Sequence, residues 1–169
     1  MLLLLLACAT DPADSAGSPA TAEWRACPLA LPSGPPEEAD AWYRCVDVHL
    51  QGGAGCGPDG YLLGFGGKYA RKYMLEVRPN LSEAGQAFLD HNLTCLEEAL
   101  SAGMEAEPRC EDVSTLGFAS HVPCYVESGF CELPLDDVLL IAAAVEPEDQ
   151  GLPEQAEAVA GIQAACAER

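Results

Sequence analysis

The chain has 169 residues and a mass of 17.7 kDa, which is the size of one domain, or of one domain with tails. Its 8 Lys and Arg residues stand against 27 Asp and Glu residues, so the net charge is −19. This balance argues against a nucleic-acid partner, because phosphate binding needs a basic surface, and it disfavours docking to anionic lipid. No apolar run reaches the roughly 18 residues of a membrane-spanning helix.

The first residues are typical of an export signal. Met1–Ala7 is almost entirely leucine, and the Leu-Leu-Ala-Cys stretch that ends at Cys8 resembles a bacterial lipobox, in which the cysteine is lipidated. A short secretory leader that is cut elsewhere is the alternative, and no basic residue precedes Arg25. We expect a signal peptide at 1–7, a lipid anchor at Cys8 as the only attachment to a membrane, and a location outside the cell or in the cell envelope.

The segment after the leader has the composition of a spacer. Residues 8–23 are rich in Ala, Thr, Asp, Pro, Ser and Gly and show no hydrophobic period, which predicts a flexible tether. The four prolines within 28–40 predict a rigid loop. The folded domain is therefore expected over 24–169, beginning near Trp24.

The nine cysteines are the most informative feature of the composition. Lipidation of Cys8 would leave an even number that can pair completely. The sequence has no C-x-x-C motif and its histidines His49, His91 and His121 are scattered, so it lacks the signatures of a zinc ribbon or a redox site. Four disulfides in an oxidising compartment are expected, but the count alone cannot choose between the many pairings.

Apolar residues recur with a helical period along the rest of the chain. The clearest helices are predicted at 82–101, 134–145 and 153–166, with shorter ones from Asp112 or Ser114 to Ala119 and within 124–131, and no sheet is expected. The fold class is thus all-α, a small disulfide-stapled helical bundle.

Two of these helices have further signals. Asn80 and Glu83 resemble a capping box before the helix at 82–101, and Gly103 is a plausible end for it. Within the helix at 134–145, the residues from Val138 to Val145 are apolar on all sides, which predicts a central position. The residues expected to be buried there are Leu139, Leu140, Ile141 and Val145.

Motifs of catalysis are missing from the sequence. It has no G-x-S-x-G, H-E-x-x-H or phosphate-binding loop. The glycine-rich stretches at 52–55 and 64–67 do not lie between a strand and a helix, so both are predicted to be turns. Paired cysteines would not serve as nucleophiles. We expect no enzymatic activity and no cofactor.

The charged residues allow two interpretations each. The acidic excess predicts a solvated surface, and weak calcium binding at Glu146, Glu148 and Asp149 is the sharper alternative, although no D-x-D-x-D-G loop is present. The basic cluster of Lys68, Arg71 and Lys72 lies beside Tyr69 and Tyr73. It is either an anion- or partner-binding patch or a helix face that balances acidic neighbours.

Several motifs occur together between Cys56 and Cys131. The stretch Cys56-Gly57-Pro58-Asp59-Gly60-Tyr61 is followed by Gly85-Gln86-Ala87-Phe88 with Leu93 and Cys95. Cys110, Cys124 and Cys131 come next with thirteen and six intervening residues, and Tyr125 follows Cys124 directly. In these motifs the chain resembles the stanniocalcins, the secreted glycoprotein hormones of animals. The resemblance covers about 27–166, with one residue fewer before Tyr61 than in the family.

The resemblance implies a helical fold and one particular pairing of the cysteines. Matched position by position, the implied disulfides are Cys27–Cys45, Cys56–Cys110, Cys95–Cys124 and Cys131–Cys166. A family cysteine is replaced here around Gly64 or Phe65, and its partner is absent as well. The family's dimer-forming cysteine has no counterpart up to Arg169, so no covalent dimer is implied, and a non-covalent homodimer stays open.

The resemblance also implies a class of function. It indicates a secreted or membrane-tethered, non-enzymatic binding protein with a hormone-like or regulatory role, such as calcium and phosphate homeostasis or protease inhibition, and with an unidentified protein partner. The alternative is a structural cell-envelope lipoprotein without a specific ligand. An exposed apolar patch would favour the first function and a uniformly acidic surface the second.

Overall fold

The computed structural model describes residues 23–29 and 34–169. The signal peptide at 1–7, the lipid attachment at Cys8 and nearly all of the tether at 8–23 lie outside the described residues. Within the described ranges every regular element is helical, so the all-α disulfide-stapled fold is confirmed. None of these helices is long and apolar enough to cross a membrane.

Eight α-helices are described, joined by short 3₁₀ turns and two π-helical segments. The α-helices are α1 (Ala41–His49), α2 (Lys68–Lys72), α3 (Glu83–Gly103), α4 (Cys110–Ala119), α5 (His121–Glu127), α6 (Leu135–Ala143), α7 (Pro147–Gln150) and α8 (Pro153–Ala167). The π-helical segments are η4 (Tyr61–Gly67) and η5 (Tyr73–Val77), and the 3₁₀ turns are η1 (Glu23–Ala26), η2 (Pro36–Glu38), η3 (Gln51–Gly53), η6 (Arg78–Asn80) and η7 (Phe130–Glu132).

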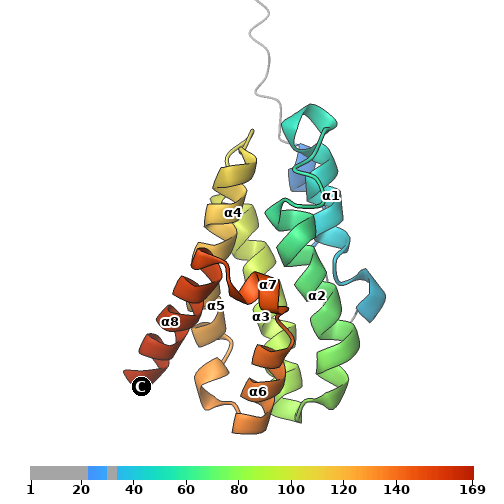
Figure 1. Ribbon diagram of the computed structural model, residues 1–169. Coiled ribbons are helices and arrows are strands. Elements are labelled where there is room, and N and C mark those ends of the chain that lie inside the picture. Colours follow the sequence, from blue (N-terminus) through green and yellow to red (C-terminus); the bar gives the residue numbers. More distant parts are fainter. Residues whose placement is uncertain (1–22, 30–33) are drawn as a thin grey trace, which may run out of the picture.

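The helices form two groups on either side of α3. In Figure 1, α1 and the continuous rod of η4, α2 and η5 lie on one side, and α4, α5 and α8 lie on the other. α3 packs against α4 and α5, while η4 packs against both α1 and α4 and so connects the two groups. The core between them is rich in aromatic rings, and Trp24, at the expected start of the domain, is buried in it.

The long helices expected from the periodicity are confirmed in α3, α6 and α8. The expected capping box at Asn80 is wrong, because Ser82 is the N-cap of α3. Ser82 Oγ accepts a hydrogen bond from the Gly85 backbone N–H at 3.2 Å, whereas Asn80 Nδ2 donates to the Glu76 carbonyl. A serine oxygen placed three residues before an unpaired helical N–H satisfies that donor directly.

The turn predicted at 64–67 is wrong, whereas the one at 52–55 is confirmed. Gly52, in the turn η3 that follows α1, has a φ of 65°, which suits glycine. Gly66, by contrast, lies inside the helical segment η4, and a Cβ atom there would lie 2.5 Å from the Tyr43 ring. The glycines of η4 therefore allow it to lie directly against α1, which periodicity of large apolar residues could not indicate.

Four disulfides connect segments that are distant in the sequence, with Cα–Cα distances of 5.2 to 5.8 Å. The pairs are Cys27–Cys45, Cys56–Cys110, Cys95–Cys124 and Cys131–Cys166, which are the pairs that the resemblance implies. Each contributes about 2–4 kcal/mol by restricting the unfolded chain. Bonds of this kind form in oxidising compartments and indicate such an environment for this chain.

The prediction that α6 is buried on all sides is half wrong. Ile141 and Val145 are buried, with exposed fractions of 2% and 9%, but Leu139 and Leu140 are 57% and 40% exposed. Only one face of α6 meets the bundle, where the Tyr73 hydroxyl donates to the Ile141 carbonyl at 3.2 Å. The apolar residues on the other faces are therefore surface residues that the fold itself does not bury.

The close contact between Gly117 of α4 and the ring of Tyr61 supplies a test of the core. A Cβ atom at Gly117 would lie 2.2 Å from Tyr61 Cζ, and the buried Tyr61 ring is held against Phe65 and Phe118. We expect Gly117→Ala to lower the free energy of unfolding by about 1–3 kcal/mol, although alanine is the better helix former.

Urea unfolding followed by circular dichroism measures this change. Gly151→Ala is the matched control, because its nearest neighbour would be 3.5 Å away, and it should change stability by no more than about 0.5 kcal/mol. Equal stabilities of the two variants would contradict the packing of η4 on α4.

Candidate binding groove

An open groove with a mainly apolar lining lies between α6 and α8. It has a volume of about 530 Å³. One wall is formed by Val138 and Ala142 of α6, and the other by Ala156, Val159 and Ala160 of α8. Figure 1 shows the two helices diverging toward their lower ends, where the C-terminus lies.

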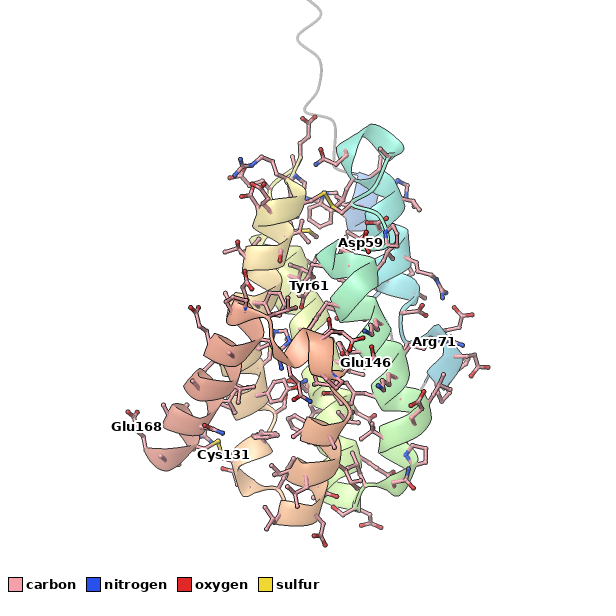
Figure 2. All side chains as sticks on the ribbon, viewed as in Figure 1. Asp59, Tyr61, Arg71, Cys131, Glu146 and Glu168 are labelled. Atoms are coloured by element: carbon pink, nitrogen blue, oxygen red, sulfur yellow. A yellow bond between two sulfur atoms is a disulfide. The ribbon has the colours of Figure 1, made fainter. Side chains whose placement is uncertain are left out.

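The groove exists because α8 is held by α5 and not by α6. α8 packs against α5 and α4, whereas α6 packs against η5. Gly161 allows the close approach of α8, since a Cβ atom there would lie 2.7 Å from Val122 Cγ2 on α5. The Cys131–Cys166 disulfide links the far end of α8 to η7, as Figure 2 shows at Cys131. α8 is thereby fixed at a distance from α6.

Small side chains keep the groove unfilled, and an apolar stripe extends one of its walls. Leu135, Val138, Leu139 and Ala142 follow one another at helical steps of three and four residues, so they share a face of α6. Leu135 is 70% exposed and Leu139 is 57% exposed. We call this face the α6 stripe. It continues the apolar wall of the groove onto the surface.

The floor of the groove is polar but uncharged at neutral pH. Burial raises the pKa of Tyr125 to about 12, and burial also lowers the pKa of His121 below its ordinary value. His121 Nδ1 lies 2.8 Å from the Gly117 carbonyl oxygen, to which its neutral N–H donates. Both rings line the groove together with Tyr73. The floor therefore offers aromatic surface and no full charge.

One acceptor beside the floor has no donor. Gln155 Oε1 is buried and has no hydrogen-bond partner among the residues of 23–29 and 34–169, and Gln155 lines the groove. A buried acceptor without a partner costs roughly 1–3 kcal/mol.

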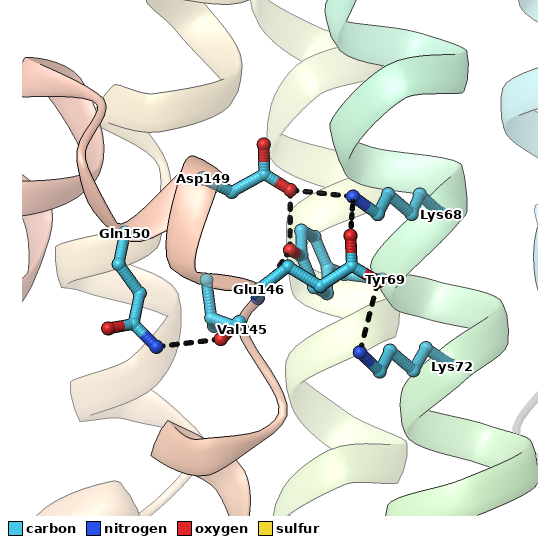
Figure 3. A network of polar contacts seen from close by, with 7 residues as sticks. All are labelled: Lys68, Tyr69, Lys72, Val145, Glu146, Asp149 and Gln150. Atoms are coloured by element: carbon cyan, nitrogen blue, oxygen red, sulfur yellow. Dashed lines mark hydrogen bonds and ion pairs between the residues drawn. The ribbon is translucent and has the colours of Figure 1, made fainter.

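A network of ion pairs joins the segment after α6 to α2 (Figure 3). Lys68 Nζ lies 2.5 Å from Glu146 Oε2 and 2.8 Å from Asp149 Oδ2, and Lys72 Nζ lies 3.2 Å from Glu146 Oε1. The Tyr69 hydroxyl donates to Asp149 at 2.5 Å and accepts from the Glu146 backbone N–H at 2.9 Å. These contacts fasten the start of α7 to α2 and position the end of α6.

The same network decides between the interpretations of the charged residues. The basic cluster is a helix face that balances acidic neighbours, since Lys68 and Lys72 each contact Glu146. Hydrogen bonds from these two lysines lower the pKa of Glu146. The proposed calcium ligands Glu146 and Asp149 are thus already neutralised by ammonium groups, so the structure argues against a cation site at these carboxylates.

The three histidines do not form a site together. His49 lies 3.3 Å from Glu23, His91 is exposed on α3, and His121 is buried in the floor of the groove. Among the described residues, one group has metal-ligand spacing, namely Cys27, Cys45 and His49. Its two cysteines form a disulfide, so they offer no thiolate to a metal.

The surface around the groove is acidic. Exposed carboxylates on its two helices are Asp136, Glu154, Glu157 and Glu168. The sequence has no Lys or Arg between Arg109 and Arg169, and Arg169 pairs with Glu132 at 3.1 Å. The uncharged aromatic floor and the small apolar walls therefore lie between two helices whose charged side chains are all carboxylates.

The sequence did not predict this groove. Its apolar pattern placed the helix at 134–145 in the core, although an apolar helix surface suits an intermolecular interface equally well. The α6 stripe, which begins at Leu135, was the available signal. The small residues of the opposite wall, such as Ala156 and Ala160, carried no signal, because alanine is common on exposed helices.

Comparisons with known proteins give no match, whether to a family model, to a curated protein or to a solved structure. The resemblance to the stanniocalcins therefore rests on the sequence motifs. Two of those motifs meet in the fold, since the rings of Phe88 and Tyr125 lie 5.4 Å apart beneath the groove. The Phe88 ring also lies 5.4 Å from the Phe130 ring, so Phe88 packs against two aromatic rings that line the groove.

His121 predicts how stability depends on pH. Because its pKa is lowered in the folded chain, the unfolded chain binds more protons, and the free energy of unfolding falls as pH drops below about 6.5. The slope for one such group is at most about 1.4 kcal/mol per pH unit. We expect His121→Phe to lose this part of the pH dependence, whatever its stability at neutral pH.

Urea unfolding at a series of pH values between about 7.5 and 5 measures the slope. The exposed His91 provides the control, and His91→Gln should keep the slope of the unchanged chain. Parallel curves for the unchanged chain and for His121→Phe would contradict the burial of a neutral His121.

Proposed function

We propose that this chain is a non-enzymatic binding protein of an oxidising compartment outside the cytosol, and that it holds a segment of a protein partner in the groove between α6 and α8. The observation that carries the proposal is the exposed apolar surface of the α6 stripe, continuous with an open groove of about 530 Å³. Contiguous exposed apolar surface on a small protein is typical of an interaction site.

The alternative, a structural envelope lipoprotein without a ligand, predicts a uniformly acidic surface. Leu135 and Leu139 interrupt the acidic surface with apolar side chains that are more than half exposed. Such residues contribute little to the stability of the isolated chain, whereas covering them gives about 25 cal/mol for each Å² of apolar surface. This favours the binding function. A lipid anchor at Cys8 suits either function.

The resemblance to the stanniocalcins makes the proposed binding regulatory, either hormone-like or inhibitory toward a protease. Two observations support that part of the proposal. The four disulfides join the pairs that the resemblance implies, and its motif residues Phe88 and Tyr125 pack together under the floor. The capture experiment described next would identify the partner.

Partner capture with matched surface variants tests the proposal. The oxidised chain is used to capture proteins from an extracellular or envelope extract of its own cells. Val159 is 42% exposed in the groove and Val48 is 58% exposed on α1, away from it. We expect Val159→Asn to weaken capture of one protein by about tenfold, because a polar amide replaces apolar surface that the partner covers.

The control is Val48→Asn, which makes the same chemical change outside the groove and should capture that protein as the unchanged chain does. Both valines are partly exposed, so both variants should unfold at about the same urea concentration as the unchanged chain. Capture that is equal for all three chains would contradict a binding role of the groove.

A further inference from the structure

We propose that the segment held in the groove is a cationic amphipathic helix of the partner, with an apolar face that enters the groove and Lys or Arg on its flanks. This inference rests on the proposed function and names the chemistry of the partner. It follows from three features of the described residues: the shape of the walls, the state of the basic side chains and the charge of the border.

The walls have the form that a third helix requires. Both are helices with apolar residues at steps of three and four, on α6 from Leu135 to Ala142 and on α8 from Ala156 to Ala160. Side chains of a helix pack as ridges into the grooves between such rows. Ala142, Ala156 and Ala160 leave space that large side chains at positions i, i+3 or i+4, and i+7 of a docked helix would fill.

The charge of the partner follows from the state of the basic residues. All eight Lys and Arg side chains already have a partner within the chain. Their contacts are Arg25 with the Met104 carbonyl, Arg44 with Glu38 and Asp40, Lys68 with Glu146 and Asp149, Arg71 with Asp40, Lys72 with Glu146, Arg78 with Asp90, Arg109 with Asp112, and Arg169 with Glu132. The exposed carboxylates of α6 and α8 therefore have no basic side chain left to balance them.

The exposed carboxylates of the two wall helices favour a basic partner. Asp136 lies next to the α6 stripe, and Glu154 and Glu157 lie on the helix that forms the other wall. A docked helix with acidic flanks would meet like charge on both sides, which opposes association, whereas Lys and Arg would meet opposite charge.

The same charge argues against a second copy of this chain as the occupant. Each copy has a net charge of −19 and the same acidic border, so a symmetric dimer through the groove would bring carboxylates together. Like charges at an interface oppose association and suppress the wrong partners. We therefore do not expect self-association through the groove, but the test must be able to detect it.

Designed peptides test the inference on the full oxidised chain. A basic probe of roughly 18 residues, about five helical turns, carries leucine on one face and Lys and Arg on its flanks. An acidic probe has the same leucine face with Glu at every flanking position, and a third peptide is a scrambled form of the basic probe. Binding is measured by fluorescence anisotropy at low and at high salt.

We expect the basic probe to bind at least about tenfold more tightly than the acidic and scrambled probes, and this advantage to shrink as salt screens the border. Val159→Asn should weaken binding of the basic probe. The double variant Asp136→Lys with Glu157→Lys should remove its advantage over the acidic probe. The control is the double variant Glu105→Lys with Glu107→Lys, which has the same net charge as the first double variant but carries its changes in the loop before α4. It should keep the preference for the basic probe.

The outcomes separate the failure of this inference from that of the proposed function. Equal binding of the basic and acidic probes, with both weakened by Val159→Asn, would keep the groove as the binding site and overturn its preference for cations. Binding of no probe at all, or binding that Val159→Asn leaves unchanged, would overturn both. A dimer of the chain that Val159→Asn dissociates in sedimentation would assign the groove to a second copy and overturn the inference.

Discussion

The disulfide between Cys131 and Cys166 is the constraint on which the rest of the functional surface depends. It joins the turn after α5 to the last helix, and the Cys95–Cys124 disulfide joins the same α5 to the central helix α3. Because Gly161 allows α8 to lie directly on α5, α8 has its position fixed along its length by packing and at its end by a covalent bond. α8 is therefore unable to close against α6, and an apolar groove stays open between two helices.

The other wall is held by polar contacts of moderate strength. Tyr73 bonds to the backbone of α6, and Lys68, Lys72 and Tyr69 fasten the segment after it through Glu146 and Asp149. These ion pairs are partly exposed, so each contributes only about 0–1 kcal/mol, but their shared carboxylates fix one geometry. The network also occupies the basic residues of that region, which leaves the border of the groove acidic.

The sequence predicts the helical framework well and the functional surface poorly. The apolar residues that recur at helical spacing between Phe88 and Leu100 predict α3, because large apolar side chains at that spacing indicate a buried helix face. Gly66 and Gly117 carry no such signal, since each acts by the absence of a side chain against Tyr43 or Tyr61. Leu139 was expected in the core because a local pattern cannot distinguish residues that the fold buries from residues that a partner covers. Only the relative positions of α6 and α8 make that distinction.

Disulfide mapping tests the central claim most directly. The oxidised chain is digested without reduction, and the linked peptides are identified by mass spectrometry. The account predicts that Cys131 is found linked to Cys166 and Cys95 to Cys124, because the first bond holds α8 to the turn after α5 and the second holds α3 to α5. A link from Cys166 to any cysteine other than Cys131 would place α8 elsewhere in the bundle, and the groove between α6 and α8 would then not exist.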